Sequence, residues 1–315
     1  MKIAILGAGA MGSLFGGLLA EAGQAVTLID INEAHLGAIR EGGLRLETDS
    51  GQRRVTSMKV GRPGEVTEAP DLLVVFTKTL HTTAALDGVR SLIGPMTQVL
   101  SLQNGLGNVE AIGAFVPKER TLIGVTTWPA DLVGPGHVHS HGQGAIRLMS
   151  ADGVQRPAVA EVVAALSAAG LRCEADATVW AAIWEKVAFN AALNSLCAVT
   201  GCSVDQLGAV DDGTSMAFAI VSEVVAVARA LGIEANAAKC QANVSHAIAT
   251  HAGHKPSMLQ DMLAGRRTEV ESINGAVVSR AKTLGLAVPH TQVLLGLVRL
   301  KEQQIAATRR VAGVH

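Results

Sequence analysis

The sequence has little charge and no uninterrupted apolar run long enough to cross a bilayer. Charged residues make up 17% of its 315 positions and the formal net charge is −1. The chain therefore lacks the excess positive charge that attracts nucleic acid or an anionic membrane surface. The most apolar segment, residues 216–231, is interrupted by Glu223 and Arg229, which argues against a membrane span there. We therefore expect no nucleic-acid partner and no membrane partner.

Cysteine is also scarce. The four cysteines, Cys173, Cys197, Cys202 and Cys240, show no CxxC spacing, so neither a zinc site nor a disulfide framework is indicated. Reduced thiols of this kind fit a cytoplasmic protein. The N-terminal stretch superficially mimics a signal peptide, but its glycines have a better explanation.

That explanation is a phosphate-binding turn. A strand-like run, Lys2 to Leu6, leads into the glycine motif Gly7, Ala8, Gly9, Ala10, Met11 and Gly12, and an apolar helical run follows to Gly23. In such a motif the first glycine permits the tight turn, the second lets backbone N–H groups approach a pyrophosphate, and the third lets the helix pack against the strand. We expect these six residues to bind a dinucleotide, although a purely structural turn is the alternative.

Asp30 indicates which dinucleotide binds. It ends a second strand-like run, residues 25–29, where an acidic residue accepts hydrogen bonds from the adenosine ribose. A carboxylate there repels a 2′-phosphate, and the next residues supply no arginine to bind one. The sequence therefore favours NAD(H) over NADP(H), unless Asp30 merely caps the helix that begins near Asn32.

The two halves of the chain differ in pattern. Further strand-like runs occur at residues 71–76, 98–102 and 121–125, separated by stretches that can form helices, which is typical of a parallel sheet. Long segments that are helical in length and composition follow at 177–199, 212–232, 236–251, 267–285 and 289–305. We predict an α/β fold with a Rossmann-type, doubly wound domain over residues 1–175, an all-helical domain over 176–315, and a cleft between them. The helical segments are apolar on more than one face, which suggests a homodimer.

Polar residues follow two of the predicted strands. Lys78 comes after the strand ending at Phe76, and Asn104 after the strand ending at Leu102. Ligands of such sheets bind beyond the carboxyl ends of the strands, so Lys78 can neutralise a phosphate or carboxylate and Asn104 can contact a ribose or carbonyl. The alternatives are a solvated loop lysine and a plain turn residue.

A polar stripe on a predicted helix suggests the catalytic group. Lys186, Asn190 and Asn194 stand at i, i+4 and i+8 of an otherwise apolar segment, so they share one narrow face. A lysine beside a nicotinamide can stabilise the alkoxide that forms when hydride reaches a ketone, and can donate its proton. Desolvation would lower the lysine pKa and a nearby carboxylate would raise it. The alternative is an ordinary polar helix face.

Together these residues resemble the ketopantoate reductases (2-dehydropantoate 2-reductases). The resemblance rests on the glycine turn, the Thr-Lys at Lys78, the loop from Gln103 to Gly105, the stripe of Lys186, Asn190 and Asn194, the loop from Gly124 to Ala130, and Ser257-Met258-Leu259-Gln260-Asp261 followed by Thr268-Glu269. It runs in order from Met1 to about Glu302.

The resemblance implies that a reduced nicotinamide reduces a branched 2-keto acid, ketopantoate to pantoate on the route to pantothenate. It makes Lys186 the proton donor and assigns Asn190, Asn194, Ser257 and Asn104 to the substrate. Asn104 also touches the cofactor in this scheme, as do Ala130 and Glu269. From the residues alone, Ser257 is a helix-start or capping residue and Glu269 a first-turn carboxylate.

Three departures from the family pattern leave other functions open. The chain has Asp30-Ile31-Asn32 where NADPH-dependent members often carry an arginine, His254 at one substrate-side asparagine and Val204 near another. A relative that acts on a different 2-keto or 2-hydroxy acid is therefore an alternative. So are a 3-hydroxyacid dehydrogenase of the 6-phosphogluconate dehydrogenase type and a non-catalytic dinucleotide-sensing protein.

Three alternating histidines, His137, His139 and His141, would share one face of a strand, as metal ligands do. Flanking glycines and the absence of a carboxylate or cysteine nearby in the sequence favour a glycine-rich hairpin instead. We therefore predict no metal site.

Overall fold

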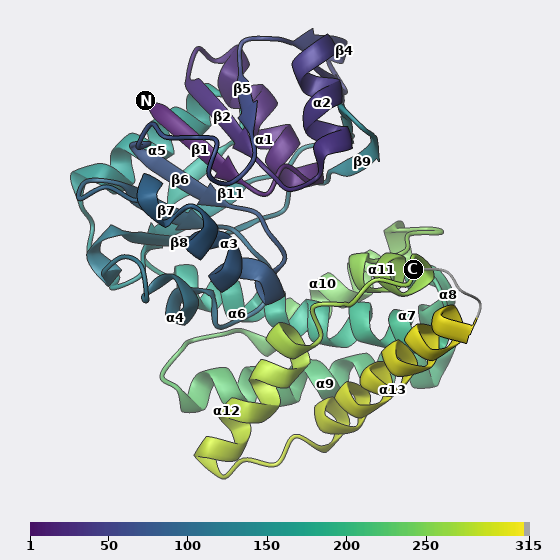
Figure 1. Cartoon of the computed structure of the whole chain (residues 1–315). Helices are drawn as coiled ribbons and strands as arrows, with labels where there is room; N and C mark the ends of the chain where they lie inside the picture. Colours follow the sequence, from purple (N-terminus) through teal and green to yellow (C-terminus); the bar gives the residue numbers. More distant parts are fainter. Residues whose placement is uncertain (312–315) are drawn as a thin grey trace. The chain divides into compact units, whose positions relative to one another are not determined.

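The computed structural model describes residues 1–311, which form two compact units (Figure 1). One unit comprises residues 1–103 and 107–179, and the other comprises residues 104–106 and the chain from Trp180 onward. The second unit thus includes a short loop, residues 104–106, that comes from within the sequence of the first unit.

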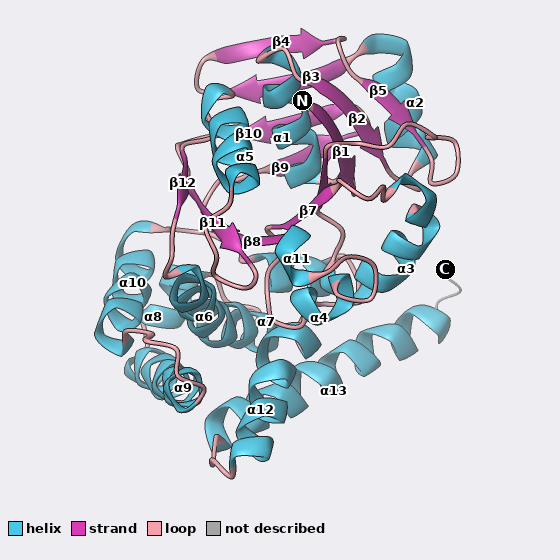
Figure 2. Cartoon of the chain, turned by 90° about the vertical axis from the view of Figure 1, so that its left-hand side faces the viewer, coloured by secondary structure: helices cyan, strands magenta, loops and turns pink. Residues whose placement is uncertain are grey.

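An eight-stranded sheet forms the centre of the first unit (Figure 2). Its strands, in spatial order, are β12 (Cys173–Ala175), β11 (Ile146–Ser150), β8 (Thr121–Thr126), β7 (Gln98–Ser101), β6 (Leu72–Val75), β1 (Lys2–Leu6), β2 (Ala25–Ile29) and β5 (Lys59–Gly61). All neighbours are parallel except β8 and β11. The order runs outward from β1 in both directions, as in a doubly wound Rossmann-type sheet. This confirms the predicted fold class.

Five helices accompany the sheet. They are α1 (Ala10–Glu21), α2 (Glu33–Gly42), α3 (Thr82–Gly88), α4 (Asn108–Ile112) and α5 (Pro157–Ala168), with 3₁₀ turns η1 (Thr79–His81), η2 (Arg90–Leu92) and η3 (Lys118–Arg120). The central strands are continuously apolar because both of their faces are covered; Leu72 to Val75, for example, have no exposed surface.

A second sheet, which the sequence analysis did not predict, lies on α1. Its strands, in order, are β4 (Gly51–Val55), β3 (Leu44–Thr48), β10 (His137–Ser140) and β9 (Asp131–Gly134). Helix α1 contacts strands of both sheets. In β3, Leu44 and Leu46 are fully buried while Arg45 and Glu47 are half-buried, the alternation of a strand with one covered face. The pairing of β3 with β10 joins residues 92 positions apart, such as Arg45 and His137, and patterns along the sequence do not reveal such a distant partner.

The second unit is helical. Its elements are α6 (Val179–Phe189), η4 (Asn190–Asn194), α7 (Ser195–Thr200), α8 (Val204–Gly208), α9 (Asp211–Ala230), α10 (Ala237–Thr250), α11 (Ser257–Leu263), η5 (Glu271–Gly275), α12 (Ala276–Leu284) and α13 (Pro289–Val311). The predicted helical segments are confirmed, but two of them contain a π-helical turn, η4 and η5. Their core includes Trp184, Val221, Val224, Val277 and Val298.

Helix α9 is the one helix in residues 1–311 that is long and apolar enough to cross a membrane by length and composition. It supplies buried side chains to the core of this unit. Its Glu223 accepts hydrogen bonds from the backbone N–H groups of His290 and Thr291 and from the Thr291 hydroxyl. Glu223, the charged residue that interrupts the apolar run, therefore binds the start of α13 to α9.

Candidate active site

The glycine turn joins β1 to α1 as predicted. Gly7 has φ +99°, the left-handed region that glycine tolerates. A Cβ on Gly12 would collide with the Gly7 carbonyl oxygen, whereas one on Gly9 would meet nothing within 4 Å. The third glycine therefore permits close packing, and the second leaves open space in front of the backbone.

The start of α1 suits an anion. Among the described residues, no side chain caps this helix and no acidic side chain lies in its first turn. Its first N–H groups have no partner inside the helix, and its dipole favours negative charge there. The turn therefore fits the pyrophosphate of a dinucleotide.

Asp30 connects β2 to this turn. One carboxylate oxygen accepts the Ala8 N–H at 2.6 Å, and the other accepts the N–H groups of Ile31 at 2.7 Å and Asn32 at 2.9 Å. The cap of α2 is Asn32, whose side chain accepts the His35 N–H. The alternative interpretation of Asp30 as the helix cap is therefore wrong.

A cavity of about 570 Å³ opens at the carboxyl ends of β1, β2 and β6. Its lining brings together Gly7, Gly9, Asp30 and Lys78, all predicted cofactor residues, with apolar Ile31 and Pro63. The site lies where the strand order reverses, between β1 and β6, which is where doubly wound sheets bind their ligands. Its size suits part of a dinucleotide.

Two polar side chains, Gln103 and Ser13, hold the loops of this site in place, and neither role was predicted from the sequence. Gln103 donates from Nε2 to the Thr77 carbonyl at 2.6 Å and to the Thr82 hydroxyl at 2.8 Å. It thereby fixes the loop that carries Lys78. The fully buried Ser13 hydroxyl lies 2.8 Å from the Ala8 carbonyl, to which it donates.

His35 supports Ser13 in turn. Its Nδ1 accepts the Gly136 N–H at 3.0 Å, so Nε2 carries the proton and donates to the Ser13 hydroxyl at 3.0 Å. Burial lowers the pKa of His35, which keeps the ring neutral, as this arrangement requires. The glycine turn is thus connected through α1 and α2 to the second sheet.

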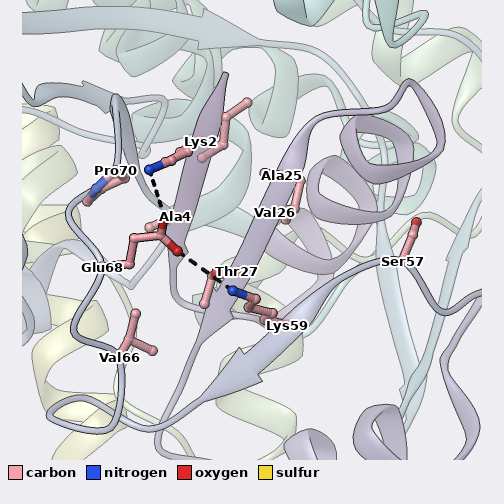
Figure 3. A pocket seen from close by; sticks show the side chains of 11 residues that line it. Lys2, Ala4, Ala25, Val26, Thr27, Ser57, Lys59, Val66, Glu68 and Pro70 are labelled. Atoms are coloured by element: carbon pink, nitrogen blue, oxygen red, sulfur yellow. Dashed lines mark ion pairs between the residues drawn. The ribbon is translucent and has the colours of Figure 1, made fainter.

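A smaller cavity of about 150 Å³ lies beside β1, β2 and β5 (Figure 3). Its one carboxylate, Glu68, is shared by two lysines: it lies 2.7 Å from the Lys2 ammonium and 3.6 Å from that of Lys59. The residues that line it include the first residues of β1 and β2, Lys2 and Ala25. The glycine turn is at the other end of β1, so this cavity is not the dinucleotide site.

In the second unit, Lys186 lies near the end of α6. Burial lowers its pKa to about 8, and the Glu269 carboxylate partly opposes that shift. Of the two effects that the sequence left open, desolvation therefore dominates. An amine with this pKa can give up a proton near neutral pH.

The two asparagines of the stripe lie in the π-helical segment η4. Asn190 is 6% exposed and Asn194 is 7% exposed, and within residues 1–311 neither amide makes a side-chain hydrogen bond. Buried polar groups are normally satisfied, so these amides are suited to hold a polar ligand. π-helical turns are rare and occur frequently at functional sites.

Asn274, which the sequence analysis missed, joins η4 to η5. Fully buried, it donates from Nδ2 to the Ala191 carbonyl at 3.1 Å and accepts the Ser195 hydroxyl at 2.7 Å. The loop that bears Asn104 is also fixed on η5, because the Leu106 N–H donates to the Ser272 carbonyl at 2.8 Å. The signal for Asn274 was the run Ser-Ile-Asn-Gly, whose polar residues do not fit an ordinary amphipathic helix.

Other predicted residues lie on exposed or partly exposed positions. Ser257 is the exposed first residue of α11, after Pro256 at the cap position, so the helix-start interpretation is confirmed. Ala130 lies in the loop between β8 and β9, partly exposed. Two of the three departures from the family pattern, His254 and Val204, are neighbours, since the Val204 N–H donates to the His254 carbonyl at 3.1 Å.

Comparison with protein families accounts for both units. Residues 3–153 match the model of ketopantoate reductase PanE/ApbA, and residues 178–302 match the model of its C-terminal domain. The chain belongs to the ketopantoate reductase family. This confirms the resemblance drawn from the glycine turn, the lysine stripe and the Ser257 segment.

Curated relatives of the family are similar over nearly the whole chain. The 2-dehydropantoate 2-reductase of Streptococcus pyogenes serotype M1 is 36% identical over 96% of this chain and 98% of its own length. That of Halobacterium salinarum is 36% identical over 96% of this chain and 99% of its own.

Solved structures of similar sequence share the fold. A D-mandelate dehydrogenase with NADH and anilino(oxo)acetate is 34% identical, with a TM-score of 0.93 over 97% of this chain and 100% of that one. A family member from Ralstonia eutropha is 32% identical, with a TM-score of 0.90 over 97% and 100%.

Proposed function

We propose that the protein is an enzyme that reduces 2-dehydropantoate to pantoate with a reduced nicotinamide, and that Lys186 is the proton donor. The observation that carries the proposal is a lysine whose pKa is lowered to about 8 on a helix that continues into two buried amides. The curated relatives named for this reaction support the substrate.

Each group has a task in this scheme. The glycine turn, Asp30 and Lys78 bind the dinucleotide, which supplies the hydride when bound. Asn190 and Asn194 orient the keto acid, with Asn104 and Ser257 as further substrate contacts. Lys186 donates its proton to the carbonyl oxygen as negative charge develops there. Ala130 and Glu269 are proposed cofactor contacts, and Glu269 also keeps Lys186 protonated.

Purified protein incubated with NADH or NADPH and 2-dehydropantoate should consume the reduced cofactor. The same assay with other branched 2-keto acids and with phenylglyoxylate tests the substrate. A larger kcat/KM for one of those acids would replace 2-dehydropantoate but retain the chemistry. No turnover with any acid and either cofactor would support a dinucleotide-sensing protein instead.

We propose that NAD(H) is preferred over NADP(H) because of Asp30. In the Asp30→Ala variant the ratio of kcat/KM for NADPH to that for NADH should rise about tenfold. Two unit charges about 4 Å apart interact by about 1 to 4 kcal/mol in water or near a protein surface, and a factor of ten corresponds to about 1.4 kcal/mol. The substitution also removes the hydrogen bond between Asp30 and the Ala8 N–H. Any loss of activity from that change affects both cofactors and cancels in the ratio. The matched control is Glu33→Ala, which removes a nearby exposed carboxylate. An unchanged ratio would leave Asp30 only its role in holding the turn.

The rate of keto-acid reduction should fall as the pH rises through about 8, because only protonated Lys186 can donate, and the reverse oxidation should rise over the same range. Glu269 raises the pKa of Lys186. In the Glu269→Gln variant, both the fall in kcat/KM for keto-acid reduction and the rise in kcat/KM for the reverse oxidation should therefore shift to lower pH. Glu271→Gln, which alters a carboxylate paired with Arg299, is the control. A Glu269→Gln profile identical to the wild type would exclude this role for Glu269.

We further propose a cytoplasmic homodimer. The four cysteines are free thiols, in keeping with a reducing compartment. On α13, Val293, Leu297 and Leu300 are 63%, 43% and 62% exposed, and their spacing places them on one helix face, which a second copy would cover. Light scattering should give about twice the 32.4 kDa chain mass; the chain mass itself would contradict the dimer.

A further inference from the structure

A group of histidines and carboxylates lies on the second sheet of the first unit. Strands β3 and β10 run parallel there, and Glu47 is the direct partner of His139 in their register. His141 follows the end of β10, and Asp49 follows the end of β3. The hairpin that carries the histidines contains no carboxylate close to them in sequence, but the fold places β3 beside it.

Three of these residues are positioned to share one ion. Glu47, His139 and His141 each offer a ligand atom, and these atoms all lie within 4.8 Å of one another. The two imidazole rings meet edge to face with their centroids 3.9 Å apart. Within the described part of the chain, His139 makes no side-chain hydrogen bond of its own, so its ring nitrogens have no other assigned task.

Neighbouring groups orient two of the three ligands. Asp49 lies 2.9 Å from Nδ1 of His141 and also accepts the Gly142 N–H at 2.9 Å. Nδ1 therefore carries a proton, and Nε2 of His141 is left with a lone pair. A carboxylate bonded to the far nitrogen of a ligating histidine is a recurring feature of metal sites. Similarly, Nε2 of His137 lies 3.0 Å from one oxygen of Glu47, which leaves the other oxygen for an ion.

We propose that Glu47, His139 and His141 bind a divalent transition-metal ion, with zinc as the reference ion. Two imidazoles and a carboxylate suit zinc, copper or nickel rather than magnesium or calcium, which prefer oxygen ligands alone. The ion joins β3 to the end of β10, and water completes its coordination because His141 is exposed. This proposal differs from the prediction of no metal site, which rested on the flanking glycines and on the absence of a carboxylate or cysteine near the histidines in the sequence; Glu47 comes from a distant segment.

The test is calorimetric titration of the full chain, without a histidine tag, with zinc chloride. The background is His251→Ala, because His246, His251 and His254 form a second group of histidines that could bind zinc weakly. We expect one equivalent of zinc with Kd below about 100 μM, a higher Tm in its presence, and no binding of magnesium at the same concentration.

Variants in the same background identify the ligands. Glu47→Gln and His139→Ala should each weaken zinc binding at least tenfold and abolish the rise in Tm. Asp49→Asn should weaken it about tenfold through the orientation of His141. His290→Ala, which removes an exposed histidine elsewhere, should change neither the zinc affinity nor the rise in Tm.

Retained NADH binding and an unchanged circular dichroism spectrum show that each variant is folded. Zinc binding no tighter than about 1 mM, or binding that survives both Glu47→Gln and His139→Ala, would overturn the proposal. The proposal is independent of the reductase activity, because none of these residues serves the reaction.

Discussion

Replacing Lys186 by alanine is expected to lower kcat about 10²- to 10⁴-fold, the usual contribution of a positioned acid. The ammonium interacts most strongly with the charge that develops on the carbonyl oxygen, so its loss affects the transition state more than the bound ground state. The affinity for NADH should remain nearly unchanged, because the glycine turn, Asp30 and Lys78 lie in the other unit. Stopped-flow kinetics and a fluorescence titration with NADH separate the two quantities.

Lys239→Ala is the matched control. Lys239 lies on α10 and pairs with Glu185, the residue next to Lys186, at 2.6 Å. Its removal deletes a lysine close to α6 without touching the proposed acid, so kcat should stay near that of the wild type. If Lys186→Ala weakened NADH binding as much as it slowed turnover, Lys186 would be a cofactor-binding residue.

Asn274→Ala is expected to destabilise the second unit by roughly 2–4 kcal/mol. The change leaves the Ala191 carbonyl without this donor and leaves the Ser195 hydroxyl only the Met258 sulfur, 3.5 Å away, as a weak acceptor. A buried unsatisfied group costs about 1–3 kcal/mol, and the sulfur offsets part of the cost at Ser195. Because η4 carries Asn190 and Asn194, the KM for the keto acid should also rise, while the Kd for NADH should not. Urea unfolding measures the first effect, and steady-state kinetics measures the second.

Two further variants make the Asn274 result specific. Asn243→Ala, at an exposed position of α10, should change neither stability nor KM. Asn274→Asp keeps an acceptor for Ser195 but no donor for Ala191, so it should restore only part of the stability. An unchanged KM in a folded Asn274→Ala protein would limit Asn274 to a structural role.

The sequence predicted most of the fold because its signals are local. The five strands at Lys2, Ala25, Leu72, Gln98 and Thr121 are short apolar runs between turn residues, and the structure has a strand at each. The long helical segments also follow from composition and length. The π-helical turns were not predicted, because they depend on tertiary contacts such as the one from Asn274 to Ala191 rather than on the pattern of residues along the helix.

In the candidate site, too, the residues found from the sequence are those with local signals, and the residues missed are those whose partners lie far away along the chain. The glycine turn, Asp30 and Lys78 were found from their positions after strands, and the structure gathers them at one cavity. Gln103, Ser13 and His35 were missed as supports of that cavity, because their partners are up to 101 residues away along the chain. The carboxylates beside the histidines were missed for the same reason, since Glu47 and His137 are 90 positions apart.

By itself, the sequence determined the fold class, the family and the identity of the proposed proton donor, since each depends on residue types at short spacings along one chain. Only the tertiary structure decided the protonation behaviour of Lys186 and the group of ligands around His139. Both depend on which distant segments exclude water or bring charge to a side chain, and the free energy of a charge is set by those neighbours in space.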